Sequence, residues 1–307
     1  MMLVLLLRRS ERLPSDIPNA RSLHDRVIPR GGGVAIFAGW FAGTLWLPST
    51  RPWLGPLVAI IAVSLWDDIR PLPPLIRLAV HAVAASVWAW LAPSTLPLIV
   101  AVIIVVWTAN LYNFMDGSDG LAAAMTVIGF GAYTLAATFN EGPTASTTLA
   151  LVAATSPFLA FNWPPAKIFM GDVGSVPIGF LAGVLGIEGW ASGVWPAWFP
   201  VLVFLVFIAD ATMTLIRRLL SRATVWEAHR EHHYQRLVQM RCGHQGTLVL
   251  YASLMAMTGV TALVAMFWFP AAGGPLLAAW IVVLVVVFVG IGYHWQRKSG
   301  LSHESKD

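Results

Sequence analysis

The feature that most constrains this chain is a succession of long apolar stretches with almost no charge inside them. A helix that crosses the ~30 Å hydrocarbon layer of a bilayer needs about 20 mostly apolar residues. We predict ten spans, at residues 31–50, 53–66, 75–92, 98–115, 121–139, 146–162, 175–188, 195–216, 247–269 and 275–295. Only 11% of the residues are charged, against roughly 25% in soluble domains, so lipid must be the main solvent. The sequence therefore predicts an all-α, polytopic transmembrane helical bundle that forms one integral-membrane domain over residues 1–307.

The chain opens with seven apolar residues that are followed at once by Arg8 and Arg9. At 1.5 Å per residue this stretch reaches about 10 Å and cannot span a membrane. No A-x-A-like cleavage site follows it, so it is not a usable signal peptide. We expect a short N-terminal helix here, which could be the remainder of a truncated first span.

The basic residues set the orientation of the spans. When the connections alternate between the two sides, all 19 Lys and Arg residues except Arg51 fall on one side. Positive charge is retained in the cytoplasm, so the segment 1–30, the connections 67–74, 163–174 and 217–246, and the C-terminal tail are predicted to be cytoplasmic. Topology thereby explains the pI near 9.6, and no nucleic-acid partner is expected.

Several residues are expected to be structural. His81 is expected to make an interhelical hydrogen bond, and Gly39 and Gly43 have the spacing of a small-residue packing motif. Glu188 is predicted to lie in an external turn. Interfacial anchoring is predicted for Trp40, Trp46, Trp53, Trp88, Trp90, Trp190, Trp195 and Trp198. A single cysteine excludes a disulfide framework and a cysteine-based metal site.

Acidic and amide side chains collect in clusters on the predicted cytoplasmic side. Asp67 and Asp68 end one span, where adjacent carboxylates repel each other unless a cation or a shared proton relieves them. The next cluster, NLYNFMDGSDGLAAA, carries oxygen-bearing side chains at a spacing of three, at Asn110, Asn113, Asp116 and Asp119. On one continuous helix this spacing would form a stripe. Such oxygens are the ligands that Mg²⁺ accepts, usually with substrate phosphates completing the shell.

Two further clusters follow on the same side. The segment NWPPAKIFMGDVGS carries Asn162, Lys167, Asp172 and Ser175. Its end opens a span, and its backbone N–H groups are predicted to receive phosphate. The segment HREHHYQRL carries three histidines, for which phosphate binding or proton handling is favoured over zinc because hard oxygen ligands are already available. Together the clusters predict Mg²⁺, with Mn²⁺ as the alternative, and a diphosphate at a membrane face.

These motifs resemble those of the polyprenyl-phosphate N-acetylhexosamine-1-phosphate transferase superfamily. That superfamily includes the phospho-MurNAc-pentapeptide translocase and the enzymes that start O-antigen, enterobacterial common antigen and teichoic acid synthesis. The resemblance covers nearly the whole chain, including residues 16–33, the paired aspartates, and the NLYNFMDGSDGLA and NWPPAKIFMGDVGS motifs. The HREHHYQRL pattern is similar to the branch that initiates O-antigen or capsule chains, which argues against the pentapeptide translocase.

The resemblance implies a Mg²⁺-dependent enzyme of the bacterial inner membrane, with its active site on the cytoplasmic face of the bilayer. It would move a hexosamine-1-phosphate from a UDP-sugar to undecaprenyl phosphate, releasing UMP. The oligomeric state stays undecided, with a homodimer as one possibility. A secondary transporter is the alternative from another class, but its ionisable residues would lie near the midplane and its halves would repeat.

The resemblance also implies residue roles. Asn113 and Asp172 are expected to be metal ligands, and Asp116 is expected to be a catalytic residue that holds the metal together with Asn113. Asp67 or Asp68, also predicted to be catalytic, would deprotonate or orient the lipid phosphate. Among the histidines, His229 and His232 are carried over as catalytic because the second histidine of the H-x-x-H pair matches the family position, and His233 is not. If this stretch is helical, the spacing lets both face one phosphate. Substrate binding is expected of Arg30, Asn110, Asp119, Asn162, Lys167 and Ser175. For Asp210 the choice between helix packing and substrate contact stays open.

Overall fold

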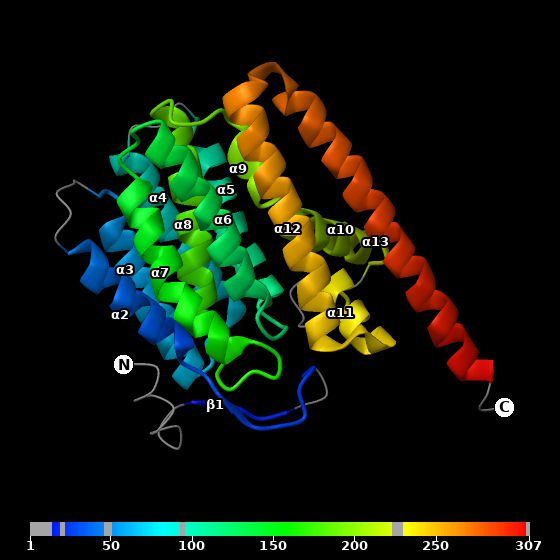
Figure 1. Cartoon of the computed structure of the whole chain (residues 1–307). Coiled ribbons are helices and arrows are strands. Elements are labelled where there is room, and N and C mark those ends of the chain that lie inside the picture. Colours follow the sequence, from blue (N-terminus) through cyan, green and yellow to red (C-terminus); the bar gives the residue numbers. More distant parts are fainter. Residues whose placement is uncertain (1–13, 19–21, 46–50, 93–95, 223–229, 305–307) are drawn as a thin grey trace.

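The computed structural model describes residues 14–18, 22–45, 51–92, 96–222 and 230–304. It is helical nearly throughout and confirms the predicted membrane bundle (Figure 1). The helices are α2 (Gly32–Thr44), α3 (Leu54–Ile69), α4 (Pro74–Leu91), α5 (Leu98–Met115), α6 (Leu121–Phe139), α7 (Ala145–Asn162), α8 (Asp172–Ala191), α9 (Trp198–Val203), α10 (Leu205–Leu220), α11 (His233–Leu237), α12 (Gly243–Trp268) and α13 (Gly273–Glu304). A short ladder joins β1 (Ser15–Asp16) to β2 (Ile28–Pro29).

Each predicted span contains a helix, because a long apolar stretch in lipid can satisfy its backbone hydrogen bonds only as a helix. Six described helices are long and apolar enough to cross a membrane by length and composition alone. The predicted span 195–216 was wrong as one helix, because it is two helices, α9 and α10, interrupted at Phe204. The helix in the last predicted span, α13, continues beyond residue 295 to Glu304. Beyond this interruption α10 runs obliquely to the other helices (Figure 1). The predicted N-terminal helix lies outside the described residues.

The helix α8 forms the centre of the bundle, and its glycines let neighbouring helices approach closely. A Cβ at Gly183 would lie 2.4 Å from Oγ1 of Thr108 on α5, and one at Gly179 would lie 2.5 Å from the backbone oxygen of the same threonine. Small residues at helix contacts permit this kind of packing in membranes. The close approach places Asn113, at the end of α5, beside the first turn of α8.

The helix α2 crosses the start of α8 at two glycines. A Cβ on Gly33 would lie 2.3 Å from the backbone nitrogen of Gly174. Further along α2, Gly39 and Gly43 face Ala154 and Ala150 of α7, which confirms their predicted packing role. The α2–α8 crossing therefore fixes the position of the residues just before both helices.

We expect Gly33→Ala to lower the thermal midpoint of the detergent-solubilised protein by several degrees. The added methyl group would meet backbone atoms, which cannot move aside as a side chain can, and overpacking typically costs about 1–3 kcal/mol. Gly55→Ala is the matched control, because a Cβ there meets nothing within 4 Å. Tryptophan fluorescence during heating measures both, and equal midpoints would contradict the tight crossing.

Interfacial anchoring was wrong for several tryptophans. Trp40, Trp53, Trp88 and Trp195 are buried in the core, whereas Trp90 is exposed. The reason is that their indole N–H groups find internal acceptors: Trp40 donates to the backbone oxygen of Thr147, and Trp195 to that of Gly186.

The predicted external turn at Glu188 was also wrong. Glu188 lies inside α8 and accepts hydrogen bonds from the indoles of Trp53 at 3.1 Å and Trp88 at 2.9 Å. These contacts join α3, α4 and α8 at the end of the bundle opposite the acidic clusters.

Candidate active site

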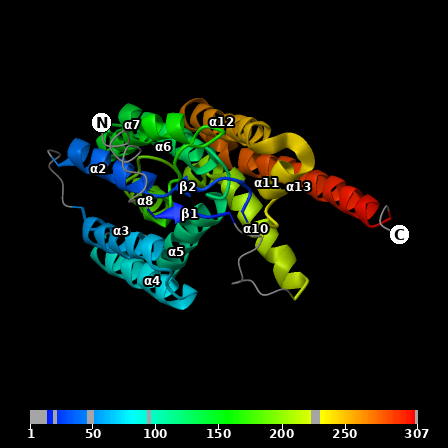
Figure 2. The ribbon, with the colours of Figure 1, turned by 90° about the horizontal axis from the view of Figure 1, so that it is seen from below.

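Segments that are far apart in the sequence meet at one end of the bundle, around a cavity of about 400 Å³. Seen from below, the β1–β2 ladder crosses this end beside α8 and α10 (Figure 2). The lining comes from residues 16–30, the α5–α6 connection, the α7–α8 connection and residues 234–244. All of these segments lie on the side that carries the basic residues, so the charge pattern grouped them correctly.

The N-terminal segment places Arg30 at the cavity. The residues before α2 run beside those before α8, since the N–H of Phe169 donates to the oxygen of Pro29 and the N–H of Gly32 donates back to Phe169. The Arg30 guanidinium donates to Asp16 at 2.8 Å. Arg30 is therefore held at the cavity by a carboxylate of the same ladder.

The stripe predicted for the second cluster exists only in part. Asn110 and Asn113 lie on α5, but α5 ends at Met115, and Asp116 and Asp119 lie in the connection that follows. Gly120, at φ 75°, allows the tight turn into α6. Because α5 ends before them, Asp116 and Asp119 leave the face of the helix that carries Asn110. They line the large cavity, whereas Asn110 lines a separate small one.

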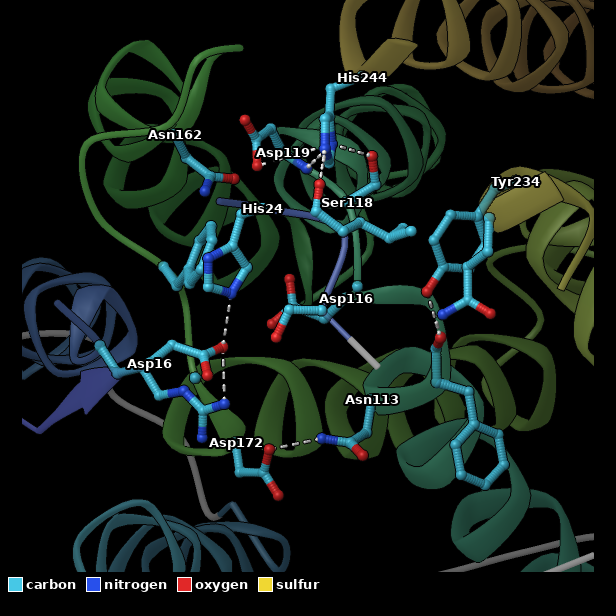
Figure 3. A pocket seen from close by; sticks show the side chains of 18 residues that line it. Asp16, His24, Asn113, Asp116, Ser118, Asp119, Asn162, Asp172, Tyr234 and His244 are labelled. Carbon is cyan, nitrogen blue, oxygen red and sulfur yellow. Dashed lines mark hydrogen bonds and ion pairs between the residues drawn. The ribbon is translucent and has the colours of Figure 1, made fainter. Parts of the chain in front are cut away.

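Asn113, Asp116 and Asp172 come together at the large cavity (Figure 3). The amide of Asn113 donates to Asp172 at 2.8 Å and to the hydroxyl of Ser175 at 3.2 Å, which leaves its oxygen available. Among the described residues no group donates a hydrogen bond to the Asp116 carboxylate. Burial, followed by the charges of Asp172 and Asp68, raises the pKa of Asp116 well above its ordinary value. A carboxylate in this setting attracts a cation.

The paired aspartates have different partners. Both oxygens of Asp68 accept backbone N–H groups at the start of α8, from Asp172 at 3.1 Å and Val173 at 3.0 Å. Gly171, at φ 76°, is needed there, because a Cβ would lie 2.7 Å from Asp68. The prediction that these N–H groups receive phosphate was therefore wrong: a carboxylate from α3 already accepts them.

Asp67 instead faces the small cavity of about 30 Å³ beneath Asn113 and Asp172. Arg77, on α4, donates to Asp67 at 2.8 Å and to Asp172 at 3.0 Å and so links the two. His81 and Asn110 complete this polar pocket and lie 3.4 Å apart, as expected for an interhelical contact. The two cavities thus share Asn113 and Asp172 as a common wall.

Asp119 and Asn162 hold the loops that surround the large cavity. Asp119 accepts the N–H of Ala166 at 2.9 Å, and Asn162 accepts that of Gly120 at 2.9 Å. Asn162 also donates to the oxygen of Ile168. Both residues line the cavity, but most of their hydrogen-bonding capacity connects the α5–α6 and α7–α8 connections to each other.

Other candidates lie apart from the cavity. Ser175 is completely buried beneath Asn113, and the side chain of Lys167 is exposed. His232 stacks on Phe114 and lines neither cavity. The helical spacing assumed for the histidine pair was wrong, because α11 begins only at His233. His229 lies outside the described residues.

Asp210 has a packing role. Its buried carboxylate accepts the N–H groups of His233 and Tyr234 at 2.8 and 3.1 Å, the ring Nδ1–H of His233, and the hydroxyl of Tyr251. Tyr234 in turn donates to the oxygen of Phe114 at 3.0 Å. Asp210, on α10, therefore fixes α11 against α10 and α12, and Tyr234 joins α11 to α5.

Sequence reasoning missed Arg77, His24, Tyr234, Gln235 and His244, all of which line one of the cavities. For Arg77 a signal was present, since it is a cation within one turn of the start of a predicted span, ten residues after Asp67. For His244 the only signal was a polar residue at the start of an apolar stretch.

The donor set suits Mg²⁺ better than zinc. The cavity offers carboxylate and amide oxygens at Asp116, Asp172 and Asn113, which are hard ligands. Within the described parts of the chain, no three His, Cys, Asp or Glu side chains converge into a complete metal cage. Mg²⁺ is commonly bound by one or two carboxylates and completed by substrate phosphates, so an incomplete protein cage fits it.

Comparisons with known proteins identify related sequences. Residues 51–190 match the family model described as glycosyl transferase family 4. The chain is 29% identical over 304 residues to a probable undecaprenyl-phosphate N-acetylglucosaminyl 1-phosphate transferase of Bacillus subtilis, covering 90% of this chain and 82% of that protein. It is 26% identical to a decaprenyl-phosphate N-acetylglucosaminephosphotransferase of Mycolicibacterium smegmatis, covering 88% and 80%. A phospho-N-acetylmuramoyl-pentapeptide-transferase of Moorella thermoacetica is 38% identical, over 43% of this chain and 39% of that protein.

Proposed function

Because the chain belongs to the polyprenyl-phosphate N-acetylhexosamine-1-phosphate transferase superfamily, we propose that it transfers an N-acetylhexosamine-1-phosphate from a UDP-sugar to undecaprenyl phosphate. The products are a polyprenyl-diphosphate sugar and UMP. The observation that carries the proposal is the convergence of Asn113, Asp116, Asp172 and Arg30 on one cavity at the basic end of a membrane bundle. That end faces the cytoplasm of a bacterial inner membrane, where UDP-sugars are made.

In the reaction, an oxygen of the polyprenyl phosphate attacks the phosphorus that bears the sugar, and the bond from that phosphorus to UMP breaks. Both reactants are anionic, so charge neutralisation and in-line positioning are the main tasks of the site. A Mg²⁺ or Mn²⁺ ion held by Asp116, Asp172 and the Asn113 oxygen would neutralise the diphosphate and stabilise the departing UMP. Arg30, oriented by Asp16, donates to a diphosphate oxygen.

The lipid substrate approaches from the small cavity. Arg77 is the cation there, and it would exchange its pairing with Asp67 and Asp172 for the lipid phosphate as this small cavity opens. Asp67, whose oxygens otherwise accept from Arg77 and from the N–H of Leu72, would then orient that phosphate or accept its proton. Asp68 does not contact substrate in this assignment. It caps α8 and thereby holds Asp172 in place. This assignment divides the paired aspartates into one that faces substrate and one that positions the metal ligand.

The biological role that we propose is the initiation of O-antigen or a related surface polysaccharide. The HREHHYQRL pattern supports this branch, and the two N-acetylglucosamine-transferring relatives align over most of the chain. The pentapeptide-transferase relatives align over 43% to 57% of the chain, a smaller share than those two relatives, which makes UDP-MurNAc-pentapeptide the second candidate donor.

Purified protein with undecaprenyl phosphate should move label from UDP-N-acetylglucosamine, or from another UDP-N-acetylhexosamine, into butanol-extractable lipid. EDTA should reduce the rate at least a hundredfold, because without the metal ion the charge of the diphosphate is not neutralised. Added Mg²⁺ should restore the rate. A panel of UDP-sugars identifies the donor. Transfer from UDP-MurNAc-pentapeptide alone would select the second candidate, and transfer from no donor would refute the proposed function.

A further inference from the structure

Residues 22–26, which we call the strap, contribute their first three residues to one wall of the large cavity, and the strap is held by residues more than 200 positions later in the sequence. Nε2 of His244, at the start of α12, lies 2.9 Å from the oxygen of Leu23. A guanidinium N–H of Arg230 donates to the oxygen of Ser22 at 3.2 Å. Ser22, Leu23 and His24 all line the cavity, so these two contacts help to set the position of that wall, together with the contacts of His24 with Asp16 and Phe169.

The other ring nitrogen of His244 contacts the connection between α5 and α6. Nδ1 lies 2.9 Å from the hydroxyl of Ser118 and 3.3 Å from the backbone nitrogen of Asp119 (Figure 3). A backbone N–H can only donate and a backbone oxygen can only accept. With the proton on Nε2, the imidazole donates to Leu23 and accepts from the N–H of Asp119, so both contacts are satisfied; the carboxylate of Asp119 lies 3.7 Å from the same Nδ1.

The residues that His244 contacts are close to the metal-binding candidates. Ser118 and Asp119 follow Asp116 by two and three positions. Asp119 holds Ala166 of the α7–α8 connection, and Asn162 holds Gly120. One imidazole thus joins the strap and α12 to the connection that carries Asp116 and, through it, to the connection that leads to Asp172.

We propose that His244 is a positioning residue for the reaction: it ties the strap to the α5–α6 connection and so shapes the cavity for the UDP-sugar. The proposal rests on the proposed function for the identity of the substrate. His244 acts through Leu23, Ser118 and Asp119 and does not touch the reacting atoms. The small cavity that we assign to the lipid phosphate does not include His244, so the lipid substrate should be unaffected.

Two substitutions separate the two contacts. Asparagine places an amide oxygen near the position of Nδ1 and can accept from Ser118 and Asp119, but its side chain is too short to reach Leu23. Glutamine places its amide nitrogen near the position of Nε2 and can donate to Leu23, but it leaves the other contact unmade. His244→Ala removes both, and His294→Ala is the matched control because His294 is exposed on α13.

The position of the strap can be followed without turnover. Cys242 is the only cysteine of the chain and is exposed, so a Cys242→Ser background carrying Leu23→Cys has one reporter thiol. Leu23 is half-buried and packs against the core, so a maleimide should label it slowly while the strap is held. We expect His244→Ala and His244→Asn to label about tenfold faster, and His244→Gln to label at nearly the rate of the reporter background. The scale corresponds to the loss of about one hydrogen bond.

In the protein that keeps Leu23 and Cys242, His244→Ala should raise the KM for the UDP-sugar and the Kd for UDP about tenfold. The KM for undecaprenyl phosphate should be unchanged. His244→Gln should recover most of the nucleotide affinity, and His244→Asn should recover more of kcat, because it supports the connection that carries Asp116. Unchanged labelling in His244→Ala, or equal changes in both KM values, would overturn the proposal. If the unsubstituted protein transfers no sugar, the proposed function fails, while the labelling rate and the Kd for UDP still decide the role of His244.

Discussion

Replacing Asp116 by asparagine is expected to lower the transfer rate at least about a hundredfold without weakening the fold. The carboxylate faces the cavity with no hydrogen-bond donor among the described residues, so the fold does not depend on it. If it holds the cation that neutralises the diphosphate, its loss removes several kcal/mol from the transition state, and each 1.36 kcal/mol is tenfold in rate. Initial rates at saturating Mg²⁺ measure this effect.

The direction of the stability change in the same variant also follows from the pKa of Asp116. The pKa of Asp116 is raised, so folding disfavours its charged form, and the free energy of unfolding falls as the pH rises towards and through that pKa. An amide of the same size removes the repulsion from Asp172 and Asp68. In EDTA at neutral pH the Asp116→Asn protein should therefore melt at the same temperature as the wild type or higher.

Asp25→Asn is the control for both measurements, because Asp25 is an exposed carboxylate at the same end of the bundle. It should leave rate and midpoint unchanged. Asp172→Asn is less informative, since it would also disturb Arg77 and Asn113. If Asp116→Asn keeps more than about a tenth of the wild-type rate, or melts several degrees lower in EDTA, Asp116 is not a cation ligand.

The sequence predicted the helices well because their cause is local. A stretch of about 20 apolar residues can satisfy its backbone in lipid only as a helix, and its length sets the ends. The interruption at Phe204 was missed because the residues on both sides of it are equally apolar. The buried tryptophans were missed for a similar reason: their acceptors, such as Glu188, are supplied by other helices.

The grouping of the site was predictable, but the partners of its residues were not. Positive charge assigns each connection to a side of the membrane, which brings the acidic clusters to one end. That rule gives no information on which oxygen meets which donor. The capping of α8 by Asp68 depends on the packing of α3 beside α8, and the contact of His244 with Leu23 joins residues 221 positions apart. Neither contact leaves a pattern in the sequence.

The largest expected effect on stability is at Asp210, which is completely buried in α10. Replacing it by alanine leaves the N–H groups of His233 and Tyr234 and the hydroxyl of Tyr251 without an acceptor. A buried donor without a partner costs about 1–3 kcal/mol, so the free energy of unfolding should fall by about 3–5 kcal/mol. Denaturation by SDS in mixed micelles measures this loss.

Two milder substitutions calibrate the effect of Asp210→Ala. Tyr251→Phe removes one donor to the carboxylate, and Thr214→Val removes a longer contact of 3.3 Å, so each should cost about 1 kcal/mol. Because Asp210 fixes α11, and α11 carries Tyr234 to the wall of the cavity, Asp210→Ala should also lose transfer activity below its unfolding transition, with helix content by circular dichroism unchanged. If Asp210→Ala is no less stable than Tyr251→Phe, then α11 is held by its other contacts, such as the stacking of His233 on Phe288.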